Sequence, residues 1–209
     1  AALGAGQAMV GLETMVLSLQ NGLGNVERIQ ALLGEHTGGV LCGIAGGFGA
    51  SMRGPGHAHH NGMAAINIAE AAGGKSARLD RAVEAWRSSG FTCDPFDDIW
   101  PVVWSKLNAN IAVSASCSLF GMKTGQVKAN EQAWELSKAC VLEASACAAG
   151  NGIKLLYDDP IQWVSDFIDK MPDAHPSMYQ DVMAGRRSEI GTIHGGVVDE
   201  DSALDGGAA

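Results

Sequence analysis

A change in composition divides this sequence into two unlike halves. Before residue 94, short apolar runs alternate with glycine-rich turns and amphipathic segments, a pattern typical of a sheet covered by helices. Residues 94–98 read Asp-Pro-Phe-Asp-Asp, and beyond them the glycine-rich strand signals stop while helical periodicity continues. We therefore expect an α/β domain over residues 1–98, followed by an all-α domain over residues 99–209.

The first half contains one clear strand–turn–helix unit. An apolar run at residues 15–19 leads into a glycine-rich turn at 20–24, after which apolar residues recur at helical spacing over 26–34. This order is the unit of an α/β sheet, in which ligands bind beyond the carboxyl ends of the strands. The other elements predicted for this half are strands at 40–49, 63–69 and 91–93 and a helix at 76–89.

The second half is predicted to be helical. Apolar residues recur at helical spacing over 99–118, 131–149, 160–171 and 176–193. The Gly-Asn-Gly sequence at 150–152 is typical of a helix C-terminus, and Asp159 followed by Pro160 is typical of a helix start. Residues 195–209 are acidic and rich in small side chains, which predicts a frayed tail.

Charge and hydropathy argue against several classes of function. The net charge of -9 is unfavourable for binding nucleic acid or an anionic membrane surface. The sequence has no uninterrupted run of 18 apolar residues, so we expect no membrane partner. The five cysteines are scattered and form no Cys-x-x-Cys pair, which is the usage expected of reduced thiols in the cytoplasm.

One polar pair in the second half has the spacing of a catalytic site. Lys106 and Asn110 lie four positions apart and therefore share a helix face, beside the apolar residues Leu107 and Ile111. A lysine at the edge of an apolar stripe is partly desolvated, and it can donate a proton to an oxygen that is becoming negative. The alternative is a surface helix whose lysine extends its charged end into water.

Histidines and glycines in the first half allow two readings each. His57 and His59 would share a face of a strand and could contribute to a zinc site with His60, but no cysteine or carboxylate adjoins them, so we expect no metal. The glycines between residues 43 and 49 either let the backbone approach a cofactor or let a strand and a helix pack closely.

Four motifs in order resemble the ketopantoate reductase (2-dehydropantoate 2-reductase) family. They are Leu-Gln-Asn-Gly-Leu-Gly at 19–24, Pro-Gly at 55–56 before the histidines, Trp-Ser-Lys-Leu with Asn110 at 104–110, and Ser-Met-Tyr-Gln-Asp followed by Arg-Ser-Glu-Ile at 177–190. The resemblance covers residues 10–197. It implies a Rossmann-like dinucleotide-binding domain joined to a helical domain of the 6-phosphogluconate-dehydrogenase type, with the active site in the cleft between them.

The same resemblance implies NADPH-dependent reduction of ketopantoate to pantoate, a step of pantothenate biosynthesis. Lys106 matches the proton donor, Asn21 the asparagine between nicotinamide and substrate, and Glu189 the glutamate near the cofactor. The remaining matches are Asn110, Ser114 and Ser177 for the substrate and Ala50 for the nicotinamide. Because Ser177 and Glu189 lie twelve positions apart on one predicted helix, we expect them to touch opposite ends of a ligand. A homodimer is also consistent with the resemblance.

Two departures from the family pattern leave alternatives open. The family begins with a strand and a Gly-x-Gly-x-x-Gly phosphate loop, but the nearest glycines here, Gly4 and Gly6, lack the third glycine and a preceding strand. This predicts an incomplete nucleotide-binding domain and, in the helical domain, C-terminal helices that are cut short after Val198. It leaves a non-catalytic remnant as an alternative. Ser114 replaces a second substrate asparagine, so another 2-keto or β-keto acid is a further alternative.

Overall fold

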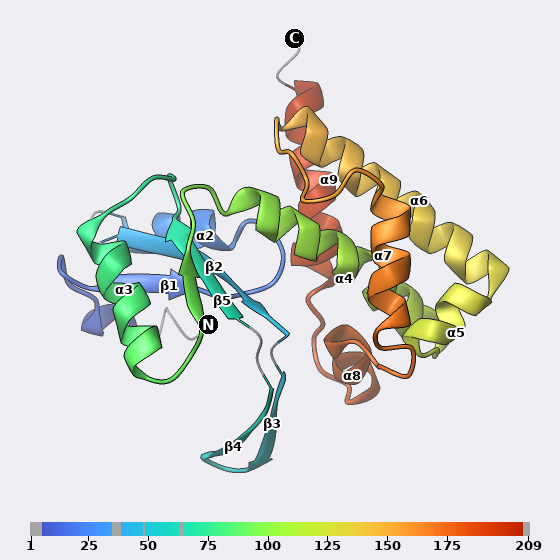
Figure 1. Ribbon diagram of the computed structural model, residues 1–209, viewed down its shortest axis with the longest axis horizontal. Helices are drawn as coiled ribbons and strands as arrows, with labels where there is room; N and C mark the ends of the chain where they lie inside the picture. The colour runs from blue at the N-terminus through green and yellow to red at the C-terminus, as the bar shows by residue number, and fades with distance from the viewer. Residues whose placement is uncertain (1–5, 35–38, 48, 63–64, 207–209) are drawn as a thin grey trace. The chain divides into compact units, whose positions relative to one another are not determined.

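The computed structural model of the protein describes residues 6–34, 39–47, 49–62 and 65–206 (Figure 1). The chain forms two compact units. The first contains the residues up to Gln20 and residues 24–99, and the second contains residues 21–23 together with the chain from Trp100 onward. The turn at residues 21–23 therefore belongs with the second unit, although its sequence neighbours belong to the first.

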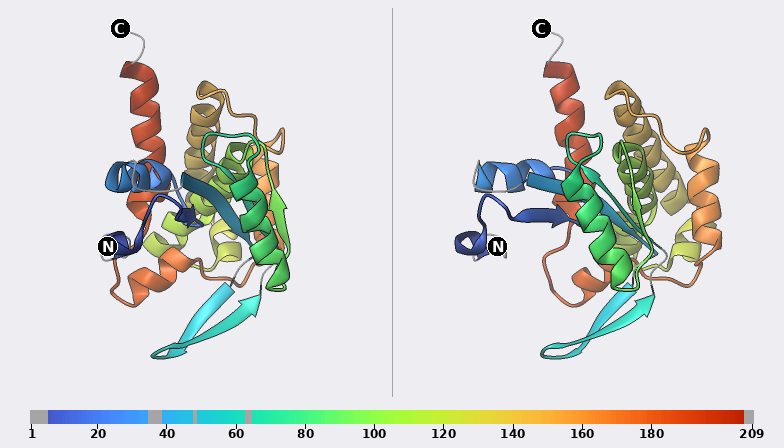
Figure 2. Two further views of the ribbon diagram at one scale, coloured as in Figure 1. Left: turned by 90° about the vertical axis from the view of Figure 1, so that its left-hand side faces the viewer. Right: turned by 60° about the vertical axis from the view of Figure 1, so that its left-hand side comes forward.

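The first unit is a mixed four-stranded sheet with two helical crossovers. Its strand order is β1-β2-β5-β6, with β1 parallel to β2, β2 antiparallel to β5, and β5 parallel to β6. Its helices each join a parallel pair of strands and lie beside the sheet (Figure 2). The elements are β1 (Met15–Ser18), α2 (Asn25–Leu33), β2 (Gly39–Gly46), β5 (Ala65–Glu70), α3 (Ala77–Ser88) and β6 (Cys93–Pro95), preceded by a 3-10 turn, η1 (Gln7–Met9).

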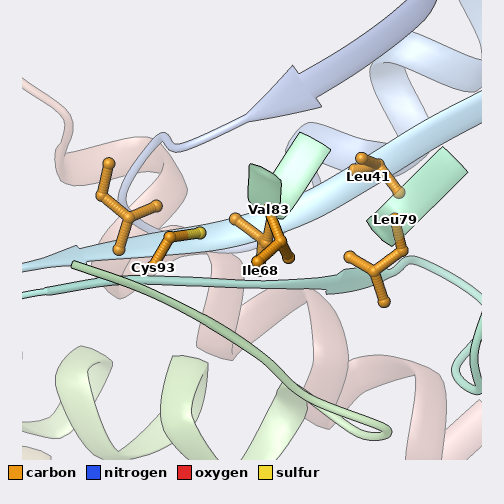
Figure 3. Packing of buried hydrophobic residues seen from close by; sticks show 6 residues of the cluster. Leu41, Ile68, Leu79, Val83 and Cys93 are labelled. Atoms are coloured by element: carbon orange, nitrogen blue, oxygen red, sulfur yellow. The ribbon is translucent and has the colours of Figure 1, made fainter. Parts of the chain in front are cut away.

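The core of this unit lies between α3 and the sheet. Leu79 and Val83 are one turn apart on α3 and pack against buried residues of the strands, including Leu41 and Ile68 (Figure 3). The helix begins where the Ser76 hydroxyl accepts a hydrogen bond from the Leu79 N–H, as an N-cap residue does. The amphipathic pattern predicted over 76–89 is thus confirmed as a helix that covers the sheet.

Two strand predictions need correction. The predicted edge strand at 91–93 is displaced toward the C-terminus, because β6 takes its register from Ile66 pairing with Cys93 and Ile68 with Pro95. The glycine-rich segment that follows β2 forms a separate hairpin of β3 (Gly49–Gly54) and β4 (His57–Gly62), which periodicity did not reveal (Figure 1). Residue 48 and residues 63–64, which fall within the predicted strands, lie outside the described residues.

The second unit is a set of helices around α4 (Trp100–Phe120), which packs against each of the other helices described for this unit (Figure 1). Buried residues occur on every side of α4, and Lys106 is its only charged residue. The other helices are α5 (Thr124–Ala129), α6 (Glu131–Gly150), α7 (Pro160–Asp169), α8 (Ser177–Met183) and α9 (Ile190–Gly206). A helix so thoroughly buried carries a charged residue at a substantial desolvation cost, which favours a functional role for Lys106.

The prediction of one helix over residues 176–193 is wrong, because these residues belong to two helices. The first, α8, ends where Gly185 adopts a left-handed φ of 65° and the Arg186 N–H donates to the Asp181 carbonyl. The frayed tail predicted from residue 195 is also wrong, since α9 continues to Gly206. Packing of Gly196 and Val197 within the unit offsets the poor helix propensity of the paired glycines.

Candidate functional site

Three polar side chains recur along one face of α4. Lys106, Asn110 and Ser114 are spaced four residues apart, so each is turned by only about 40° from the one before it. Lys106 and Asn110 are half-buried and Ser114 is fully buried. The prediction that Lys106 and Asn110 lie on one helix face is therefore confirmed.

The electrostatic surroundings of Lys106 are those of a poised proton donor. Burial lowers the pKa of the Lys106 ammonium below its ordinary value, while the negative charge of Glu189 opposes that shift. Lowering brings the pKa of an amine closer to neutral pH, where it transfers a proton more readily. Glu189 therefore favours the charged form of the ammonium, which burial disfavours.

Asn21 reaches this site because its turn is seated on the first turns of α9. Gly22 has a φ of 82°, and a Cβ atom there would lie 2.2 Å from the Thr192 carbonyl oxygen. The Leu23 N–H donates to that same oxygen over 2.8 Å, and the Leu23 side chain is buried. A Cβ on Gly196 would lie 3.0 Å from the Leu23 Cβ, so the turn and the helix touch at two glycines.

Glu189 connects the turn to α4. It directly precedes α9, and its backbone carbonyl accepts hydrogen bonds from the N–H groups of Thr192 and Ile193. The Asn21 Nδ2 donates to the Glu189 Oε2 over 3.4 Å, and the Glu189 charge acts on Lys106. All three belong to the second unit, so this arrangement is independent of how the two units are placed.

The other predicted site residues are distributed more widely. Ser177 is the exposed first residue of α8, a helix that packs on α4. Glu189, by contrast, directly precedes α9. The expectation that Ser177 and Glu189 lie on one continuous helix is therefore wrong. Ala50 belongs to the first unit, where it is exposed on β3 and pairs with His60.

The histidines considered for a zinc site, His57, His59 and His60, lie on β4. His59 is opposite Ser51 across the hairpin, and the His60 ring meets Phe91 edge-on with centroids 6.3 Å apart. Across the described ranges of the chain, no three histidine, cysteine or carboxylate side chains gather as a metal ion would require. In those same ranges no helix has both the length and the apolar character needed to cross a membrane.

Sequence reasoning missed a half-buried histidine close to the site. His194 lies on α9, and neither of its buried ring nitrogens has a hydrogen-bond partner of normal geometry. Burial lowers its pKa, and the Ile111 backbone opposes this less strongly. A histidine five positions after Glu189 in a glycine-rich segment gives no pattern by which it could have been singled out.

The stability of the protein should therefore fall in mildly acidic solution because of His194. With its pKa lowered in the folded state, the unfolded chain binds this proton at a higher pH than the folded chain does, so stability falls as the pH drops below ~6.5 toward the folded-state pKa. His194→Leu should remove that dependence. Denaturant unfolding of both proteins from pH 7.5 to pH 5 measures it, and parallel stability curves for the two would contradict the prediction.

Comparison with known proteins places the chain in a family. The family model described as "Ketopantoate reductase PanE/ApbA C terminal" matches residues 98–204, and the model "Ketopantoate reductase PanE/ApbA" matches residues 1–73. The chain belongs to the ketopantoate reductase family. Its fold is accordingly that of the family, a Rossmann-like N-terminal domain followed by a helical C-terminal domain, as the family resemblance implied.

Curated relatives and solved structures agree with this assignment. The 2-dehydropantoate 2-reductase of Streptococcus pyogenes is 27% identical over 91% of this chain, and that of Pyrococcus horikoshii is 28% identical over 90%. A PanE/ApbA family ketopantoate reductase from Ralstonia eutropha JMP134 superposes with a TM-score of 0.85 at 26% identity, covering 98% of this chain and 65% of that one. The chain spans 62% of the length of the Streptococcus relative.

Proposed function

We propose that this protein is an NADPH-dependent 2-dehydropantoate 2-reductase, which reduces ketopantoate to pantoate in pantothenate biosynthesis. The observation that carries the proposal is the joining of Asn21, Lys106 and Glu189 within one unit of the fold. These three residues come from sequence segments up to 168 positions apart, yet each matches a functional position of the family. The names of the relatives support the same reaction.

Lys106 is the proton donor of the proposed reaction. A bound nicotinamide would supply a hydride to the keto carbon, which would leave the electron pair of the C=O π bond on the carbonyl oxygen. The Lys106 ammonium stabilises that developing negative charge and then transfers a proton to the oxygen, giving the 2-hydroxy acid. Its lowered pKa makes this transfer easier, and the Glu189 carboxylate stabilises the ammonium beforehand.

Asn21 and Glu189 are suited to the nicotinamide end of the cofactor. Asn21 follows β1, at the edge of the sheet where α/β folds bind ligands, and its amide is oriented by the bond to Glu189. We propose that Ala50 also contacts the nicotinamide, and that Asn110, Ser114 and Ser177 bind the substrate. The 209 residues contain no Gly-x-Gly-x-x-Gly segment, so the proposal assigns no residue to the cofactor pyrophosphate.

Ser114 favours a second candidate, a reductase for a different 2-keto acid. Its hydroxyl is shorter than the amide that the family pattern has there, and it is fully buried on the face that carries Lys106 and Asn110. A shorter side chain leaves more room for the substituent beside the keto group. A set of candidate substrates for testing this protein should therefore include 2-keto acids with side chains larger than that of ketopantoate.

The proposed function is tested by measuring NADPH oxidation at 340 nm with ketopantoate and with this set of larger 2-keto acids. We expect turnover with ketopantoate or a close analogue, a higher kcat/KM with NADPH than with NADH, and NADPH binding in a direct fluorescence titration. Binding without turnover on any keto acid would contradict the proposed reaction. Absence of both binding and turnover would favour the non-catalytic alternative.

A further inference from the structure

A buried polar cluster lies on the side of α4 away from the proposed site. Asn108 has an exposed fraction of 0% and donates from Nδ2 to the Tyr157 hydroxyl and to the Ser145 Oγ, over 2.8 Å in each case. Ser105 is also buried, and its Oγ accepts from the Leu156 N–H over 3.2 Å. The cluster thus joins one turn of α4 to α6 and to the segment before α7.

The hydrogen bonds of this cluster run in a fixed direction. The Ser145 hydroxyl donates to the Val141 carbonyl over 2.7 Å, so its oxygen is the atom that accepts from the Asn108 amide. The Tyr157 oxygen accepts from the same amide, and it is also hydrogen-bonded to Ser105. The Tyr157 ring stacks on Trp163 with centroids 4.4 Å apart, so the acceptor is itself held in place.

This cluster satisfies the polar groups of Asn108 only in part. The Asn108 Oδ1 is buried and has no hydrogen-bond partner, which is an unfavourable arrangement for stability alone. An apolar side chain of similar size would avoid that cost. The asparagine instead contributes directional contacts. Its two donated hydrogen bonds fix the rotation of α4 about its axis and its position along that axis.

Lys106 lies within the turn that is held in this way. Ser105 and Asn108 are three residues apart and flank it in sequence, while the side chain of Lys106 projects from a different face of α4, toward the charge of Glu189. Apolar contacts elsewhere on α4 are non-directional and resist small rotations weakly. We propose that Asn108 is a positioning residue, which acts with Tyr157 and Ser105 to hold Lys106 in its catalytic position; the inference rests on the proposed function.

The test replaces Asn108 by leucine and Tyr157 by phenylalanine, separately and together, in the full protein. Asn108→Leu removes the orphaned oxygen along with the donor, so we expect Tm to change by no more than about 4 °C. We expect kcat to fall at least about 10-fold, since small displacements of a catalytic group have large effects on rate. Tyr157→Phe should act in the same direction, and the double variant should lose little more than Asn108→Leu.

A second readout is the pKa of the Lys106 amine, followed by NMR of the isotopically labelled lysine. Burial lowers this pKa and the Glu189 charge raises it, so a Lys106 that moves away from Glu189 while staying buried should titrate lower in both variants. The matched control is Ser116→Ala, which breaks another buried α4–α6 contact, the 2.8 Å bond between Ser116 and Ser137, ten residues from Lys106. Neither kcat nor the Lys106 pKa should change in that variant.

The two proposals fail in different ways. If wild-type protein turns over no keto acid, the proposed function is wrong, and the Lys106 pKa still decides whether Asn108 positions the lysine. If Asn108→Leu leaves both kcat and that pKa at wild-type values, or if Ser116→Ala lowers them equally, the positioning role is wrong. A lower Lys106 pKa with an unchanged Tm supports it.

Discussion

Replacement of Lys106 by alanine should lower kcat at least about 100-fold, while KM for the keto acid changes less. The variant loses both the proton for the product oxygen and the positive charge that stabilises this oxygen as it becomes negative. The loss belongs to the transition state, so it should appear mainly in kcat. Steady-state rates of NADPH oxidation with saturating keto acid measure it. Turnover within a few-fold of wild type would remove Lys106 from the proposed mechanism.

One further variant separates the charge of Lys106 from its proton. Lys106→Arg keeps a cation at this position, but a guanidinium stays protonated in proteins and cannot supply the proton. It should therefore bind substrate nearly normally and remain slow. The control is Lys128→Ala on α5, where the lysine pairs with Asp169 over 2.6 Å within the same unit. That variant should keep wild-type kcat.

The local part of this site could be predicted from sequence because it depends on helical spacing alone. Lys106 and Asn110 share a face in any regular helix, whereas the burial of that helix was only one of two readings, the other being a surface helix. The helix start at Asp159 was predictable for the same kind of reason, since its carboxylate accepts from the N–H groups of Ile161 and Gln162.

Contacts across long stretches of sequence could not be predicted from spacing. The partners of Asn108 lie 37 and 49 positions away, and only the packing of α4 against α6 and the segment before α7 brings them together. Asn21 and Glu189 were connected through family resemblance rather than through any pattern in the residues. The placements of Ala50, Asn110, Ser114 and Ser177 against ligands stay predictions.

The break between α8 and α9 shows why the expected long helix was wrong. Apolar residues continue at helical spacing across residues 176–193, so periodicity alone favours one helix. Gly185 turns the chain in a left-handed conformation, and the break lets Glu189 precede a new helix. The consequence is functional, because the new helix is the one on which the Asn21 turn is seated.

Replacement of Gly22 by alanine should be the most damaging change that leaves every proposed site residue in place. The added methyl group would lie 2.2 Å from the Thr192 carbonyl oxygen, closer than any non-bonded contact allows. The left-handed φ of 82° costs an alanine a further ~1–2 kcal/mol. The turn at residues 21–23 must therefore move away from α9. This movement breaks the hydrogen bond from Leu23 to Thr192 and separates Asn21 from Glu189. We expect kcat to fall about 100-fold and Tm to drop.

Gly24 supplies the matched control, because its replacement by alanine introduces the strain of a left-handed φ without any clash with α9. It lies in the same turn with a similar left-handed φ of 73°, but a Cβ atom there would meet nothing within 4 Å. Gly24→Ala should thus lose stability by about 1 kcal/mol and retain most of its activity. Steady-state kinetics and thermal unfolding of the two variants distinguish the cases. Both variants place an alanine at a similar left-handed φ, so they have a similar conformational strain. Equal losses of kcat would therefore mean that Asn21 acts without the contact between its turn and α9. A loss of kcat confined to Gly22→Ala would mean that this close contact holds the Asn21 amide at the site.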